Sequence, residues 1–331
     1  MSENRLRLQV PGLLGPLPGE LPGGILGDLP GLETWLARGD RQMLDPVAVP
    51  PAAGPLAYIA DGGAPGELHW SRALPLHLRA EAAGVRLVPV EIAETEAAHL
   101  ETDLGDLLAG HGIRLERTAT GRWYLASEHP LPDRPPPEAL AGRFVEAAIP
   151  RRAGALNWAA VLSEIELTLY EHPVNRDREY RGEPPVNALW TWGCGRQPEP
   201  PEPFAWGRVL SDDPAWQGWA RLAGAEAGEL ENATPLRPSC CTLVAVHWAE
   251  AALAVDDGPG WIDAVSAIER AFVAPAIIGL RDGVEGQRWD RLELCTAQPD
   301  HKGRVLSRKA LWRFWRRRRP FHNYVASGER G

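Results

Sequence analysis

The feature that most constrains the fold is an alternation of apolar strands and helices in the last third of the chain. Two segments have the composition of buried strands, CTLVAVHWA (241–249) and RWDRLELCTA (288–297), and a helical segment lies between them, WIDAVSAIERAFVAPAIIGL (261–280). Strands that are apolar throughout are typical of sheets covered on both faces, and a helical crossover joins parallel strands. This order predicts an α/β fold with a parallel or mixed sheet covered by helices.

The N-terminal part predicts further elements of such a sheet. RLRLQV (5–10) has the alternation of a strand, and GLETWLARGD (31–40) has the pattern of a short helix that ends at a glycine. PLAYIADGG (55–63) is interpreted as a buried strand that runs into a glycine turn. With 34 Gly and 32 Pro in 331 residues, long loops are expected between these elements.

The pattern of predicted strands and helices changes at about residue 84. GVRLVPVEI predicts a strand, ETEAAHLETDLGDLLAG a helix, and IRLERT with RWYLAS a hairpin-like pair of strands. An amphipathic helix follows over residues 155–172. These elements together predict a compact α+β subdomain.

Composition excludes several classes of protein. The net charge of −9 argues against a general nucleic-acid binder. No apolar run is long enough to span a bilayer, and Pro and Gly interrupt the N-terminus where a secretory leader would have its apolar core. No CxxC pair is present, so neither a zinc site nor a disulfide framework is indicated for the four cysteines, which are Cys194, Cys240, Cys241 and Cys295. We therefore expect a cytoplasmic protein with neither a membrane nor a nucleic acid as its partner.

The densest group of polar residues is HPVNRDREYRGEPPVNALWTWGCG, residues 172–195. Its unusual residues stand at fixed spacing: His172-Pro173-Val174-Asn175, Arg178, Gly182, Pro185, Asn187 and Trp192-Gly193-x-Gly195. The pattern resembles the H-P-V-N-x-x-R-x-x-x-G-x-x-P-A-N…W-G-x-G signature of the archaeal-type cofactor-independent phosphoglycerate mutases, with Val186 in place of the usual Ala. Shorter bacterial relatives labelled regulatory proteins of the RpfE type resemble the chain in three further segments, HWSRALPLHLR (69–79), GRWYLA (121–126) and RFWRRRRP (313–320).

The resemblance implies an alkaline-phosphatase-like core, a mostly parallel sheet with helices on both faces, interrupted by a smaller inserted α+β domain. The insertion is expected over residues 84–183, with the 172–195 motif at its end. Residues 1–83 and 184–331 are then expected to form the discontinuous core.

Mutases of this family use two divalent metals and a serine that carries the phosphoryl group, with Asp and His ligands at the ends of core strands. The resemblance places the first ligand after the initial strand, where this chain has Pro11 and Gly12. It places two more in HWAEAALAVDDG (247–258), where Ala252 replaces an Asp and Asp256 replaces a His. No serine stands in the context of a nucleophile.

Asp300 and His301 in QPDHKGR resemble the family's last Asp-His pair, but the threonine, proline and second histidine that normally follow are missing. We therefore predict no catalytic residue, no metal ligand and no cofactor. The expected function is that of a phosphoglycerate-mutase-like protein that has lost catalysis and acts as a regulatory or phospho-ligand-sensing protein.

The candidate ligand-binding residues are His172, Asn175, Arg178 and Asn187, and their expected ligand is a small phosphorylated or carboxylate-bearing molecule. Arg forms bidentate contacts with such anions, and His changes its charge near neutral pH. A purely structural interpretation is the alternative. In it His172 caps the C-terminus of its helix, Asn175 organises an Asx-turn and Asn187 braces the crossing between the domains.

Two other functions remain open on the sequence. One is an active mutase or phosphatase with an altered Mn or Mg site, built from Asp61, Asp256 and Asp300-His301. The other is binding of a protein partner through the basic and aromatic segment SRKALWRFWRRRRP (307–320). An edge strand with solvated arginines is the simpler interpretation of that segment.

Overall fold

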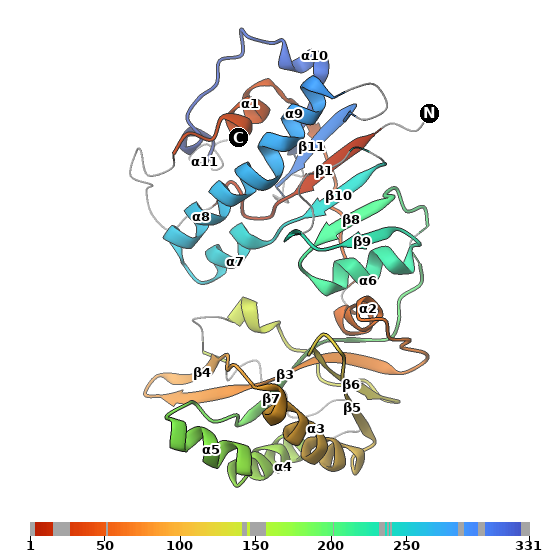
Figure 1. Ribbon diagram of the computed structural model, residues 1–331, viewed down its shortest axis with the longest axis vertical. Helices are drawn as coiled ribbons and strands as arrows, with labels where there is room; N and C mark the ends of the chain where they lie inside the picture. Colours follow the sequence, from red (N-terminus) through yellow and green to blue (C-terminus); the bar gives the residue numbers. More distant parts are fainter. Residues whose placement is uncertain are drawn as a thin grey trace. The chain divides into compact units, whose positions relative to one another are not determined.

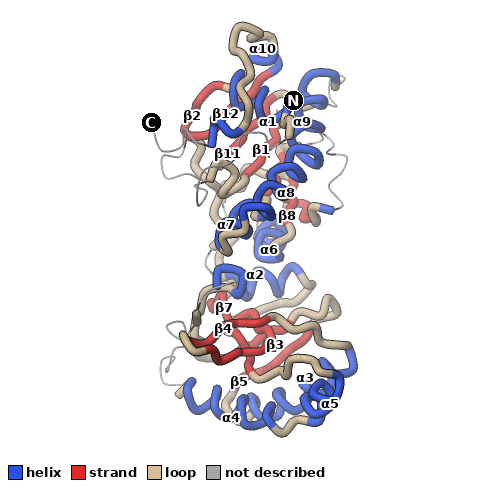
Figure 2. Tube along the Cα trace, turned by 90° about the vertical axis from the view of Figure 1, so that its left-hand side faces the viewer, coloured by secondary structure: helices blue, strands red, loops and turns tan. Residues whose placement is uncertain are grey.

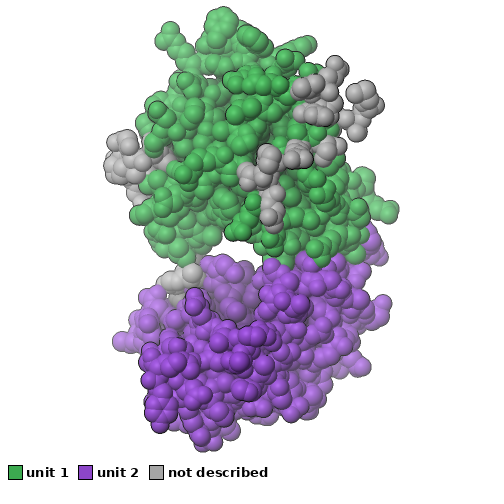
Figure 3. All heavy atoms as spheres, viewed as in Figure 1, with its two compact units in different colours: residues 1–48, 201–331 green, residues 49–200 purple. Residues whose placement is uncertain are grey.

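The computed structural model describes residues 4–15, 27–50, 52–140, 144–145, 157–200, 202–231, 236, 238, 240–283, 288–296 and 302–325 (Figure 1). The chain forms two compact units. The first unit contains residues 1–48 and 201–331, and the second unit contains residues 49–200 (Figure 3).

A seven-stranded, mostly parallel sheet lies at the centre of the first unit, in the order β2-β12-β11-β1-β10-β8-β9. β1 lies between β10 and β11 and is parallel to both. The antiparallel pairings are those of β12 with its two neighbours, β11 and β2, at one edge of the sheet. The prediction of a mostly parallel α/β sheet is thus confirmed. The strands are β1 (Arg5–Gln9), β2 (Asp40–Met43), β8 (Arg208–Ser211), β9 (Glu226–Gly228), β10 (Thr242–Ala245), β11 (Arg291–Cys295) and β12 (Lys302–Ser307).

Helices connect these strands and cover the sheet. Helix α7 and then one long helical run, which includes the predicted helix 261–280, join β10 to β11, and the run has a π-helical turn, η4, in its middle. Glu269 in that turn accepts hydrogen bonds from the amides of Gly31 (2.7 Å) and Leu32 (2.8 Å), and so caps a helix that begins almost 240 residues earlier. The helical elements are α1 (Pro30–Arg38), α6 (Pro214–Leu222), α7 (Trp248–Ala254), α8 (Gly258–Ile268), η4 (Glu269–Val273), α9 (Ala274–Asp282), α10 (Arg308–Leu311) and α11 (His322–Val325).

The core of the first unit forms where apolar side chains of the strands meet these helices. Leu6, Leu8, Val244 and Leu292 are fully buried against side chains of α1, α8 and α9. Large aromatic residues fill the space, as expected for most of the 14 tryptophans: Trp35, Trp261, Phe272 and Trp289 are at most 1% exposed.

An antiparallel sheet forms the second unit, in the order β4-β3-β6-β5, with β7 also paired to β3. Helix α2 lies on one side of this sheet and α3, α4 and α5 on the other (Figures 1 and 2). The residues of β6 alternate accordingly, because Tyr124 packs with Tyr58 of α2, whereas Trp123 and Leu125 pack with α3 and α4. The elements are α2 (Ala53–Ala60), β3 (His69–Glu81), β4 (Gly84–Val88), α3 (Glu94–Ala109), β5 (Ile113–Arg117), β6 (Trp123–Ser127), a 3₁₀ turn η1 (Pro137–Leu140), α4 (Trp158–Tyr170), α5 (Pro173–Arg181) and β7 (Ala188–Gly195).

The second unit is larger than the expected insertion at both ends. Residues 49–83 and 184–200 belong to it, whereas the sequence placed them in the core. The reason is the long antiparallel pairing of β3 with β7, which runs from Leu76 opposite Ala188 to Trp70 opposite Gly195. This pairing joins segments more than 100 residues apart, so the sequence gives no local signal of it.

Two predictions of single elements are wrong. Residues 55–63 belong to helix α2 and the turn after it, and not to a strand, because a short apolar run has no period that separates the two structures. Residues 307–320 do not form an edge strand: β12 ends at Ser307, and α10 and a loop without strand pairing follow. In the described ranges, no helix is both long and apolar enough to cross a membrane.

Candidate functional site

The predicted ligand-binding motif lies in the second unit, around helix α5. His172 directly precedes that helix and is buried. Its Nδ1 accepts a hydrogen bond from the amide of Val174 (3.2 Å), so its ring proton lies on Nε2, which donates to Asp103 Oδ2 at 2.9 Å. His172 therefore caps the N-terminus of α5 and not the C-terminus of the preceding helix, because Pro173 starts a new helix there.

The two asparagines of the motif hold backbone segments together. The amide nitrogen of Asn175 donates to the carbonyls of Leu169 (2.6 Å) and Val186 (2.7 Å), and its oxygen accepts from the amide of Val186 (2.8 Å). Asn187 makes a similar pair of bonds to the backbone of Leu78, at 2.7 and 3.0 Å. Asn187 thus joins β3 to the start of β7 within one sheet, rather than at a crossing between the two units.

The third motif side chain, Arg178, is buried, and its side chain is 3% exposed. Its guanidinium donates to Glu96 Oε2 at 2.7 Å and to the carbonyls of Glu91 (3.0 Å) and Pro184 (2.8 Å). The predicted anion-binding group therefore already holds a carboxylate of the same chain. Charge-assisted bonds of this kind bind α3, α5 and the segment before β7 to one another.

An open groove of about 610 Å³ lies beside these residues, between the segment 89–96 and the end of α5. Arg178 and Arg181 are the arginines in its lining. Arg181 donates to Glu96 Oε1 (2.5 Å) and to Glu183 Oε2 (2.8 Å), and Arg178 shares Glu96 with it. Both cations of the groove are thus neutralised by carboxylates, and a phosphate entering the groove would have to displace them.

The glycine turn at the end of the motif also holds a carboxylate of the chain. The amides of Gly193 (2.8 Å) and Cys194 (3.1 Å) both donate to Asp133 Oδ1. Gly193 has φ +67°, which favours glycine and turns two successive amides toward one acceptor. Burial raises the pKa of the Cys194 thiol, which agrees with the interpretation of Cys194 as a small residue tolerated in the turn and not as a reactive thiol.

In the first unit, Gly12, Asp212 and His247 follow the carboxyl ends of three parallel strands, β1, β8 and β10. A Cβ at Gly12 would lie 2.9 Å from Glu250 Cα, so α7 closes the end of β1. Asp212, after β8, accepts hydrogen bonds on both oxygens, from Trp248 Nε1 (2.9 Å) and from the amide of Leu230 (3.2 Å). His247, after β10, is the residue before helix α7.

Two acidic residues of the alternative metal site, Asp61 and Asp256, belong to different units. Asp61 belongs to the second unit and accepts hydrogen bonds from Thr118 (2.9 Å), Arg122 (2.5 Å) and Tyr124 (2.7 Å). Asp256 lies in the turn after α7 in the first unit, and Asp300 and His301 lie outside the described residues. Among the residues that the structure describes, no three His, Cys, Asp or Glu side chains are placed to hold a metal ion.

Comparison with known proteins relates parts of the chain to phosphoglycerate mutases. No model of a protein family matches. The probable 2,3-bisphosphoglycerate-independent phosphoglycerate mutase of Geobacter sulfurreducens is 30% identical over 103 residues, which are 30% of this chain and 26% of that protein. The corresponding enzyme of Methanothrix thermoacetophila is 35% identical over 66 residues, 20% of this chain and 17% of that protein. These matches span about a quarter or less of the relatives and show weak homology.

Solved structures resemble the chain over most of its length. PH0037 from Pyrococcus horikoshii gives a TM-score of 0.52 at 14% identity and covers 93% of this chain and 88% of that one. The cofactor-independent phosphoglycerate mutase from Thermoplasma acidophilum gives a TM-score of 0.40 at 18% identity, with 92% and 89% covered. The first of these likenesses, together with the mostly parallel sheet, confirms the predicted alkaline-phosphatase-like α/β fold class. The resemblance to the RpfE-type group stays a prediction.

The structure thus brings three of the four predicted site residues, His172, Asn175 and Arg178, together around one helix. Each bonds to its own chain. The sequence motif did not predict the acidic partners of His172 and Arg178, which are Asp103 and Glu96 and both lie on α3. Glu96 in the first turn of a helix is a recognisable capping pattern, but its pairing with a residue 82 positions later is visible only in three dimensions.

Proposed function

We propose that this protein is a phosphoglycerate-mutase-like protein that has lost catalysis and acts as a regulatory protein. Its fold class and its weak homology to phosphoglycerate mutases support the relationship. The fold class of the mutases is kept, but the residues at the ends of the core strands differ from those of the mutase pattern. Regulation by binding a partner or ligand is therefore a better-supported function than catalytic turnover.

The proposal rests mainly on the contacts made by the residues at the carboxyl ends of the strands in the first unit. A metal-dependent phosphoryl transfer needs carboxylate and imidazole groups free to bind the metals. Asp212 is committed to an indole and an amide, and the end of β1 is closed at Gly12. The alternative of an active enzyme depends on Asp61, whose carboxylate has three hydrogen-bond donors of its own in the other unit.

Sensing of a phosphorylated ligand by the 172–195 motif has less support from the geometry. Both oxygens of Glu96 bind arginines of the groove, and the glycine turn holds Asp133. These contacts favour the structural interpretation of His172, Asn175, Arg178 and Asn187.

A direct assay of mutase activity tests the proposal. The purified chain is incubated with 3-phosphoglycerate and Mn²⁺ or Co²⁺, and 2-phosphoglycerate is followed by a coupled enolase reaction. We expect no turnover above a protein-free control. Metal-dependent turnover that disappears in Asp300→Ala, but persists in the exposed-surface control Asp263→Ala, would establish the active-enzyme alternative instead.

A second function, binding of a protein partner through the basic C-terminal segment, is favoured by one specific observation. Three large aromatic side chains of that segment, Trp312, Phe314 and Trp315, are between 66% and 77% exposed.

A further inference from the structure

Residues 308–321 form a mostly exposed surface of the first unit that has no role in the site described so far, and we call them the basic–aromatic loop. It begins with α10, whose first turn is capped by Ser307, which accepts from the amide of Ala310 at 3.4 Å. It ends at Phe321, which is 2% exposed and stacks on Trp261 with 6.3 Å between the ring centroids. Both ends of the loop are therefore attached to the core.

Ion pairs and hydrogen bonds attach the loop to the end of α1 between these points. Arg313 donates to Asp40 Oδ1 at 2.5 Å and to the carbonyl of Arg38 at 3.2 Å, and Arg38 in turn donates to the carbonyl of Leu311 at 2.5 Å. The hydrogen bond from Arg313 is the main reason why the pKa of Asp40 is lowered. The loop is thus held in a defined conformation, which reduces the entropy that a bound partner would cost.

The side chains that the loop presents to solvent are large and aromatic. Trp312 is 75% exposed, Phe314 77% and Trp315 66%. By contrast, ten other tryptophans of the chain are buried. Contiguous exposed aromatic residues of this kind mark interaction surfaces, because burying them against a partner gives a large gain in apolar contact.

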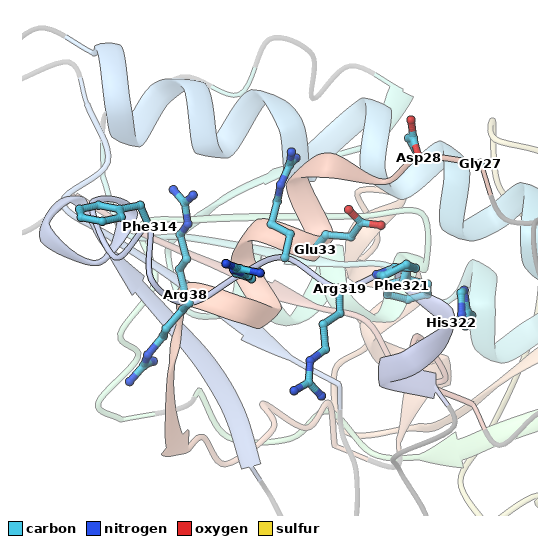
Figure 4. A pocket seen from close by; sticks show the side chains of 12 residues that line it. Gly27, Asp28, Glu33, Arg38, Phe314, Arg319, Phe321 and His322 are labelled. Atoms are coloured by element: carbon cyan, nitrogen blue, oxygen red, sulfur yellow. The ribbon is translucent and has the colours of Figure 1, made fainter.

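Cations lie around one of these aromatic residues, Phe314. Arg38 and Arg316 to Arg319 line an open pocket of about 410 Å³, together with Phe314, Phe321 and His322 (Figure 4). Asp28 and Glu33 also line it, but neither forms an ion pair with Arg317, Arg318 or Arg319 in the part of the chain that the structure describes. The sequence between residues 308 and 319 contains no acidic residue. The loop therefore concentrates positive charge on a chain whose net charge is −9.

We propose that the basic–aromatic loop binds an acidic segment of a protein partner. Tryptophan and arginine are the residue types that dominate the energy of protein interfaces, and guanidinium groups match carboxylates in geometry. Double-stranded DNA carries about one negative charge per 1.7 Å of helix axis, so it favours a basic surface that extends along the duplex. Here the cations lie on one loop and at the adjoining end of α1, on an acidic chain, so charge complementarity favours a short acidic segment. An apolar side chain of the partner packs on Trp312 and Trp315 while its carboxylates contact Arg316 to Arg319.

Fluorescence anisotropy with the full chain tests this proposal, using a fluorescein-labelled 12-residue peptide of alternating Glu and Leu. The wild-type protein binds this peptide, and it binds the matched Gln–Leu peptide at least about tenfold more weakly. Arg317→Ser/Arg318→Ser weakens binding by a similar factor. The control Arg176→Ser/Arg270→Ser changes the net charge equally at exposed positions elsewhere and leaves binding within about twofold.

Three results would overturn the proposal. The first is absence of peptide binding to the wild-type protein at millimolar concentration, and the second is an equal loss in the control. The third is tighter binding of a labelled 12-residue oligothymidylate, or of vesicles of phosphatidylglycerol, than of the acidic peptide at the same ionic strength. Trp312→Ala/Trp315→Ala, checked for folding by circular dichroism, weakens peptide binding if the aromatic residues take part, and unchanged affinity contradicts their assigned role. None of these measurements depends on whether the chain converts a phosphoglycerate.

Discussion

Replacement of Arg178 by Met distinguishes the structural interpretation of the 172–195 motif from the ligand-binding one. Methionine has an unbranched side chain that fills much of the same space, so the change removes the charge and the donors with little loss of packing. The variant loses the hydrogen bonds to Glu96, Glu91 and Pro184. If Arg178 is structural, the effect appears in stability whether or not a ligand is present.

The expected loss of unfolding free energy depends on which hydrogen-bond partners Glu96, Glu91 and Pro184 keep in the variant. Loss of one member of a buried ion pair costs about 3–5 kcal/mol when the remaining charge has no other partner. Glu96 keeps Arg181 at 2.5 Å, and the residues Glu91 and Pro184 are exposed, so water can reach their carbonyls. We therefore expect Arg178→Met to lower the free energy of unfolding of the second unit by about 3 kcal/mol, at the low end of that range.

Urea unfolding and hydrogen exchange measure this effect. Because the chain has two units, exchange in residues 91–100 and 173–187 should report the second unit separately. Arg176→Met, at an exposed position of the same helix, is the matched control and should cost less than about 0.5 kcal/mol. Equal stability of Arg178→Met and this control would contradict a structural role of Arg178. Loss, in Arg178→Met, of a thermal shift that 3-phosphoglycerate induces in the wild type would support ligand binding instead.

Further predictions concern buried polar groups. Glu269→Ala leaves the amides of Gly31 and Leu32 without their acceptor and should cost about 2–4 kcal/mol in urea unfolding. Burial raises the pKa of Glu269, so the folded state keeps its proton to higher pH than the unfolded chain. The difference in unfolding free energy between wild type and Glu269→Ala should therefore be largest below about pH 4.3 and should shrink as the pH rises through the raised pKa. A difference that grows with pH would contradict this prediction. Asp61→Ala leaves the buried Tyr124 hydroxyl unpaired and should lower the free energy of unfolding by about 2–3 kcal/mol in urea unfolding. If Mn²⁺ raises the Tm of the wild type but not that of Asp61→Ala, a metal role for Asp61 is supported instead. Cys194 should react with Ellman's reagent much more slowly in the folded protein than in urea, and equal rates would show that its burial is transient.

The hydrophobic pattern of the sequence predicted several strands and one helix of the first unit correctly. The strands near residues 5–10, 241–249 and 288–297 were correct because continuous burial leaves an apolar run, and the helix over 261–280 was correct because its periodicity is long. The apolar run 55–63 was too short for that distinction and forms helix α2. The segment 307–320 was wrong as a strand because tethers such as Arg313 to Asp40, far away in sequence, hold it as a loop.

For the candidate site, the sequence by itself determined a family resemblance, the mostly parallel α/β class and the residues of the motif. Spacing along a chain identifies which side chains are unusual, but not which groups they meet. Only the tertiary structure decided that Arg178 binds Glu96, that Gly193 holds Asp133 and that β3 pairs with β7. The physical reason is that hydrogen bonds and ion pairs depend on distances of about 3 Å between groups that the chain separates by 60 residues or more.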